Sequence, residues 1–135
     1  MANLSVNYCG VPFKNPLVLA SATPGWDGEA MCLAAEAGIG GVIPKQDWAA
    51  HPRNGRMRII RNSGKPIGQV NLELFTTMTR DAWLHKELAI AKQGGAVMQV
   101  SILAMPEPED TARLVEEMQA TGLVDLFELN VSCPM

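Results

Sequence analysis

The feature that most constrains the fold of this sequence is the alternation of short aliphatic runs with longer segments of helical period. The aliphatic runs are residues 17–20, 41–44, 67–70, 97–102 and 124–130. Such alternation is typical of β-strands joined by crossover helices, which pair side by side in a parallel sheet. We therefore predict an α/β fold with about four core strands.

Three segments between these runs have the spacing and the end signals of helices. Asp27 is a candidate N-cap for the first helix, Thr79 for the second, and the third covers residues 106–122 with proline near its start. The side chains expected to face the core are Leu33, Ala34 and Ala37, then Trp83, Leu84, Leu88 and Ala91, and finally Leu114, Val115 and Met118.

Two further segments depart from this alternation. Residues 5–13 predict a short β-hairpin that turns at Cys9 and Gly10 and precedes the first core strand. Residues 46–65 are polar and irregular, which predicts a long loop with a short strand at residues 58–61. Long loops in compact domains are often functional.

Composition limits the classes of protein to which the chain can belong. A chain of 135 residues that is 47% hydrophobic is long and apolar enough for one packed domain. Its net charge of −3 and the lack of a basic cluster argue against nucleic acid as a partner. Its apolar stretches are too short to span a bilayer, so we expect a cytoplasmic protein with no membrane partner.

Cysteine and histidine usage gives no pattern of a disulfide framework or a metal site. The three cysteines, Cys9, Cys32 and Cys133, are widely spaced and form no CxxC motif. His51 and His85 are far apart and lie in no ligand motif, so we expect both to be structural or solvated. A functional cysteine in this chain is therefore expected to act as a free thiol.

The strand count predicts only part of a closed architecture. About four strands with their crossover helices are half of the eight that close a barrel of roughly 250 residues. An open sheet of this size leaves its edge strands and one apolar face uncovered. We therefore expect residues 1–135 to form a partial barrel domain that needs a second half, in another chain or in further residues, or that pairs with itself.

Polar residues follow the predicted strands, and this is where parallel α/β folds build their sites. These residues are Ser21, Lys45, Asn71, Asn130, Ser132 and Cys133. For most of them a plain structural role is an alternative: a turn for Ser21, loop hydrogen bonds for Asn71, and a small buried side chain for Cys133. Lys45 stands apart, because a lysine is costly to bury unless it meets an anion or an electron-rich ring.

Several of these residues stand in motifs that resemble a known family. The motifs are the run 15–21, Lys45 after the second strand, Asn71, and above all Glu128-Leu-Asn-Val-Ser-Cys-Pro134. In this order they resemble the FMN-dependent dihydroorotate dehydrogenase family, over the whole chain and over the N-terminal half of the family's (β/α)8 TIM barrel. Residues 58–61, 71–74 and 81–83 resemble its dihydropyrimidine dehydrogenase branch more closely.

The resemblance implies an FMN that exchanges a hydride with the C5–C6 bond of a pyrimidine or dihydropyrimidine, such as uracil or dihydrouracil. By that analogy Ala20 and Ser21 line the flavin, and Lys45 places a positive charge beside its N1/O2 edge. Asn71, Asn130 and Ser132 would bind the pyrimidine ring, with Asn130 also against the flavin. Cys133 would be the acid/base, because a thiol titrates near about 8.5 and can be tuned toward neutrality.

The resemblance has departures and leaves alternatives. Pro44 and Gln46 stand where the family usually has hydroxyl residues, which removes one expected flavin hydrogen bond. The family's phosphate-binding loops belong to the last two barrel strands, so we expect the 135-residue chain alone to bind FMN weakly or not at all. The flavin would exchange electrons with a partner such as an electron-transfer subunit, with a soluble acceptor, or with NAD(P)H.

Three other functions remain open at this point. One is dihydroorotate dehydrogenase activity in pyrimidine biosynthesis. Another is a non-catalytic half-barrel that contributes structure to an assembly, and the third is a different FMN-dependent TIM-barrel enzyme, because this fold carries many chemistries. The flavoenzyme interpretation requires Ser21, Lys45, Asn71, Asn130 and Cys133 to lie around one pocket.

Overall fold

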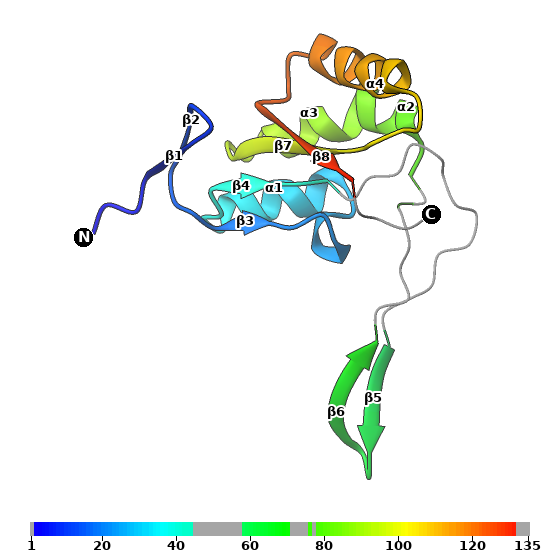
Figure 1. The fold of residues 1–135 in the computed structure, drawn as a ribbon. Helices are drawn as coiled ribbons and strands as arrows, with labels where there is room; N and C mark the ends of the chain where they lie inside the picture. Colours follow the sequence, from blue (N-terminus) through cyan, green and yellow to red (C-terminus); the bar gives the residue numbers. More distant parts are fainter. Residues whose placement is uncertain (1, 45–57, 71–75, 77, 132–135) are drawn as a thin grey trace.

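The computed structural model describes residues 2–44, 58–70, 76 and 78–131 (Figure 1). At its centre lies a parallel four-stranded sheet in the order β3-β4-β7-β8. The strands are β3 (Val18–Leu19), β4 (Gly41–Val42), β7 (Val97–Leu103) and β8 (Leu126–Asn130). The predicted α/β class with a parallel sheet is confirmed, while closure into a barrel stays a prediction.

Helices pack against one face of this sheet. They are α1 (Gly28–Glu36), α2 (Arg80–Ala82), a π-helical turn (Trp83–Glu87), α3 (Leu88–Lys92) and α4 (Pro108–Ala120). The three consecutive elements α2, the π-helical turn and α3 are together called the second helix. Met98, Val100 and Ile102 alternate along β7 and join residues of all these helical regions except α2 in one buried core. Among the described residues, no helix combines the length and apolar character that a membrane-spanning helix requires.

The predicted helix starts are confirmed by their capping contacts. The Asp27 carboxylate accepts a hydrogen bond from the Ala30 amide at 2.8 Å, and the Thr79 hydroxyl oxygen accepts one from Ala82 at 3.2 Å. Both side chains satisfy amides that the first turn of a helix leaves without a partner. The predicted inward side chains of the second and third helices are buried or packed against the core.

The predicted core face of α1 was wrong. Leu33 is 66% exposed, whereas Met31 and Ala35 are buried together with Gly28. A side chain at Gly28 would come within 2.4 Å of the Glu87 carbonyl oxygen, so this face of α1 lies close to the second helix. The buried face of α1 is therefore the one on which Gly28 allows close approach to the second helix, and not the one that carries the large apolar side chain of Leu33.

The strand predicted at residues 67–70 does not join the sheet, and this prediction was wrong. These residues belong to β6 (Lys65–Val70), which pairs antiparallel with β5 (Arg58–Asn62) in a hairpin of exposed residues. Ser63 and Gly64 both have positive φ, 47° and 79°, as tight hairpin turns require. The tight turn supplies a neighbouring strand at once, and the hairpin extends away from the sheet (Figure 1).

The N-terminal strands β1 (Val6–Tyr8) and β2 (Val11–Phe13) pair antiparallel around a turn at Cys9 and Gly10. Phe13 is buried, and its ring would lie 2.6 Å from a side chain at Gly41, so this hairpin covers the start of β4. Between the hairpin and the sheet lies an apolar cavity of about 340 Å³.

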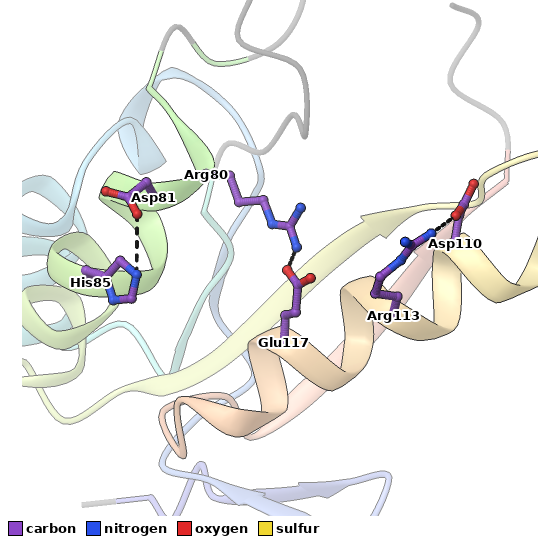
Figure 2. A network of polar contacts seen from close by, with 6 residues as sticks. All are labelled: Arg80, Asp81, His85, Asp110, Arg113 and Glu117. Carbon is purple, nitrogen blue, oxygen red and sulfur yellow. Dashed lines mark hydrogen bonds and ion pairs between the residues drawn. The ribbon is translucent and has the colours of Figure 1, made fainter.

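Polar contacts on the outer surface tie the helices together (Figure 2). Arg80 at the start of the second helix pairs with Glu117 on α4, which links two helices that are distant in sequence. Asp81 and His85 lie 3.3 Å apart within one helical turn, and Asp110 pairs with Arg113 in α4. Because these side chains are partly or largely exposed, we expect them to stabilise the fold only slightly.

A buried carboxylate holds the start of α1 against the second helix. Glu87 is 5% exposed, and its Oε2 accepts a hydrogen bond from the Gly28 amide at 2.8 Å. Its other oxygen lies 3.0 Å from Lys86 Nζ, and this hydrogen bond and the carboxylate charge raise the pKa of Lys86. The Glu87 carboxylate on the second helix therefore holds the N-terminus of α1 in position.

We predict that Glu87→Ala lowers the free energy of unfolding by roughly 1–3 kcal/mol, because it leaves the buried Gly28 amide without an acceptor. Glu87→Gln keeps an acceptor and should lose less. Urea unfolding followed by circular dichroism measures the difference. Glu116→Ala, on the exposed side of α4, is the matched control, and equal losses for Ala at both positions would contradict the role of Glu87.

Candidate functional site

The carboxyl ends of the four parallel strands meet at one edge of the sheet. Ala20 and Ser21 follow β3, Pro44 lies two residues beyond β4, Ala104 follows β7, and Asn130 is the last residue of β8. Parallel α/β folds place their ligand sites at this edge, because strands hold side chains rigidly there while the loops vary. The edge is therefore the candidate site.

Ser21 ties the ends of the first two strands together. Its hydroxyl donates a hydrogen bond to the Pro44 carbonyl oxygen at 2.9 Å. The residue is exposed, and the preceding Ala20 is exposed as well. Because the hydroxyl proton is already engaged, the Ser21 oxygen faces any further partner as an acceptor.

The loop after Ser21 folds tightly onto these strand ends. The Ala22 amide donates to the Ala20 carbonyl at 2.7 Å, and the Gly25 amide donates to the Ala22 carbonyl at 2.8 Å. A side chain at Gly25 would lie 2.7 Å from the Ile43 carbonyl oxygen. The lack of a side chain at Gly25 thus lets this loop approach the backbone at the end of β4.

Asn130 is held at the other side of the same edge. It pairs in register with Leu103, and its carbonyl accepts a hydrogen bond from the Ala104 amide at 2.9 Å. The residue is half-buried. The parallel sheet thus brings Ala20, Ser21 and Asn130 to one edge, although more than a hundred residues of sequence separate Ser21 from Asn130.

The other predicted site residues, Lys45, Asn71, Ser132 and Cys133, lie outside the described residues, and their roles stay predictions. The sequence predicts Asn71 at the end of a sheet strand, whereas residues 67–70 form part of the hairpin β5–β6. Its assignment now rests on the family resemblance alone.

The described cysteines have no feature of a reactive thiol. Cys9 is exposed in the N-terminal turn. Desolvation and the neighbouring Glu36 carboxylate raise the pKa of the Cys32 thiol, which disfavours the nucleophilic thiolate. Across the described part of the chain, no three His, Cys, Asp or Glu residues group as metal ligands.

A polar cluster on the sheet face opposite the helices was missed by the sequence analysis. On β7 the side chains of Gln99 and Ser101 are buried, and both donate hydrogen bonds to the Glu128 carboxylate of β8, at 3.0 and 3.2 Å. We had expected 97–102 to be an apolar strand. The signal was the two-residue alternation of polar positions in both strands, which separates one face of a sheet from the other.

The apolar cavity beside the N-terminal hairpin is a separate feature. Its lining consists of Val6, Tyr8, Phe13, Pro16, Val18, Ile43 and Gln99. Among the described residues, its lining offers no carboxylate, imidazole, amine or thiol that could act as an acid or base. The edge that carries Ser21 and Asn130 remains the better candidate.

Comparison with known proteins identifies relatives of the whole chain. It is 35% identical over 133 residues to the catalytic subunit of dihydroorotate dehydrogenase B (NAD(+)) from Pyrococcus abyssi, which covers 97% of this chain. The corresponding subunit of Thermococcus kodakarensis is 31% identical over 144 residues, with 99% of this chain covered. Over almost its whole length the chain therefore fits the dihydroorotate dehydrogenase family. No protein-family model matches it.

The relatives include a second type of enzyme and are longer than this chain. The chloroplastic dihydropyrimidine dehydrogenase (NADP(+)) of Arabidopsis thaliana is 31% identical over 143 residues, or 98% of this chain. The chain spans 42% of the length of the two catalytic subunits and 33% of the plant enzyme. Both types are named for removing hydrogen from a reduced pyrimidine.

We predict that Gly25→Ala lowers the free energy of unfolding by roughly 1–3 kcal/mol, because the new methyl group must displace the Ile43 carbonyl. The matched control is Gly68→Ala on β6, where a side chain meets nothing within 4 Å. Chemical denaturation of both variants gives the comparison. A neutral effect at position 25 would contradict the tight packing of this loop on the strand ends.

Proposed function

We propose that the chain supplies the first strands and part of the active site of an FMN-dependent oxidoreductase that acts on the C5–C6 bond of a pyrimidine ring. The observation that carries the proposal is the arrangement of Ser21 and Asn130 at the carboxyl edge of one parallel sheet, in a chain that fits the dihydroorotate dehydrogenase family. Function belongs to this edge, because it is where such folds bind ligands.

The groups at this edge fit a planar flavin ring. Ala20 is small and exposed, which leaves room for a ring to lie against the strand end. The Ser21 hydroxyl donates a hydrogen bond to the Pro44 carbonyl oxygen, so the Ser21 oxygen is left as an acceptor, which suits an N–H of the isoalloxazine. When bound, FMN would accept or deliver the hydride, and Lys45 would place positive charge near its N1/O2 edge.

Acid/base chemistry is assigned to Cys133, which follows β8 in the sequence. In the oxidation of a dihydropyrimidine a hydride leaves C6 and a proton leaves C5, so a base is needed at C5, and we assign that base to the Cys133 thiolate. In the reverse direction the Cys133 thiol donates the proton to C5. The side-chain amides of Asn71 and Asn130 would orient the ring, because an amide can bind a carbonyl and a ring N–H at once. The Ser132 hydroxyl would also bind the ring.

We propose uracil or dihydrouracil as the leading substrate pair, on the resemblance of residues 58–61, 71–74 and 81–83 to the dihydropyrimidine branch. Dihydroorotate is the alternative, because catalytic subunits that act on it are among the relatives. The two differ by the C6 carboxylate of dihydroorotate, which requires a cationic or donor-rich environment at C6.

Catalysis is proposed to need further βα units beside this sheet. The described helices pack against one face of the sheet, and apolar side chains on the last described strand, such as Phe127 and Leu129, are 37% and 56% exposed. A non-catalytic role as a structural half-barrel is the alternative. An electron-transfer subunit is a proposed partner, because two of the relatives are named as catalytic subunits of NAD(+)-linked enzymes.

We predict that the 135-residue chain alone gives no saturable FMN binding at micromolar concentrations, because the phosphate sites of such barrels lie on the last strands. Titration followed by quenching of flavin fluorescence is the measurement. Tight binding of one FMN per chain would contradict the need for further βα units and would leave the assignment of the edge intact.

The test of the reaction uses a complete barrel in which this chain replaces the matching segment of the Pyrococcus abyssi catalytic subunit. We predict that Cys133→Ser lowers the rate of anaerobic flavin reduction by dihydrouracil or dihydroorotate at least about 100-fold, with flavin retained. Cys32→Ser, on α1, is the control and should leave the rate unchanged. An unaltered rate for Cys133→Ser would contradict the acid/base role of Cys133. The substrate that reduces the flavin faster shows whether the enzyme acts on dihydrouracil or on dihydroorotate.

A further inference from the structure

Among the described residues of β7 and β8, one charged group stands on the sheet face opposite the helices. Glu128 of β8 pairs in register with Ser101 of β7, so both side chains lie on the same side of the sheet. The carboxylate accepts hydrogen bonds from Ser101 Oγ at 3.2 Å and from Gln99 Nε2 at 3.0 Å. Both donors are buried, while Glu128 itself is exposed.

These hydrogen bonds hold the Glu128 carboxylate in place but bring no positive charge to it, because both donors are uncharged. The other described side chains on this face of the two strands are neutral as well, namely Val97, Leu103, Leu126 and Asn130. A carboxylate that becomes buried without a cation or a proton is strongly destabilising. Whatever covers this face therefore has to compensate one negative charge at a fixed place.

We propose that the Gln99–Ser101–Glu128 cluster is the receptor for a lysine or arginine side chain on the polypeptide that covers this face beside β8. The occupant is a βα unit whose strand presents one cation among apolar residues. The inference rests on the proposed function only where it takes this sheet as part of a closed barrel. An ammonium or guanidinium group can bind the carboxylate oxygens beside the two existing donors.

A second copy of this chain fits the face poorly. In a barrel built from two copies, alternate strands contribute to the same interior layer, so the Glu128 side chains of both copies would share one layer. Two carboxylates in one water-poor layer repel each other, and one of them would have to be protonated. Charge thus selects a partner that differs from this chain at that position.

The proposal is tested by measuring how tightly two copies of the full chain associate. We predict that a mixture of wild type and Glu128→Lys associates at least about tenfold more tightly than wild type alone, because the mixture pairs opposite charges. Sedimentation equilibrium at neutral pH gives the dissociation constants. A mixture of wild type with Glu116→Lys is the control, because it makes the same charge change on the exposed surface of α4.

A neutral variant keeps the test decisive if lysine at position 128 disturbs folding. Glu128→Gln removes the repulsion and should self-associate more tightly than wild type. The proposal is overturned if wild type self-associates as tightly as the Glu128→Lys mixture, or if that mixture is no tighter than the Glu116→Lys control. It is also overturned, where lysine disturbs folding, if Glu128→Gln self-associates no more tightly than wild type. None of these outcomes bears on the flavin reaction, which is read separately from flavin reduction.

Discussion

The structure depends on burial of one face of a parallel sheet beneath α1, the second helix and α4. Met98, Val100 and Ile102 are at most 1% exposed because they point into this layer. The intervening side chains of β7 and its neighbour β8 point to the other face, where polar Gln99 and Ser101 meet Glu128. The same alternation that builds the core thus creates a second, unfinished surface with one defined charge.

Much of this fold could be predicted from local sequence signals. Asp27 and Thr79 mark the helix starts because their side chains satisfy amides of the first turn, and these contacts are local. The face of α1 could not be predicted in this way. Its burial is set by contact with Glu87, a residue 59 positions from Gly28, and by the absence of a side chain at Gly28.

Residues 67–70 show a different limit of sequence reasoning. An aliphatic run predicts a β-strand, but it does not predict which other strand that strand pairs with. Here the turn at Ser63 and Gly64 provides an antiparallel partner at the lowest loop-closure cost, and the run joins the hairpin instead of the sheet. Pairing between neighbours in sequence outcompeted the longer crossover that the parallel sheet would have required.

The candidate site was predictable where it depends on strand ends. Ser21 and Asn130 lie at the expected edge, because parallel strands bring their carboxyl ends together. The Glu128 cluster was missed, since the apolar residues of the 97–102 run hid its two polar positions. The hydrogen bond from the Ser21 hydroxyl to the Pro44 carbonyl could not be predicted either, because it joins the ends of two separate strands.

These observations support one account, in which the carboxyl edge of the sheet holds a flavin and a pyrimidine ring within a larger barrel. The most direct measurement is a crystal structure of the complete barrel containing this chain, with FMN and a pyrimidine bound. The account predicts the isoalloxazine at the end of β3 within hydrogen-bond distance of Ser21, with Asn130 contacting flavin or pyrimidine. A flavin bound away from this edge would contradict it.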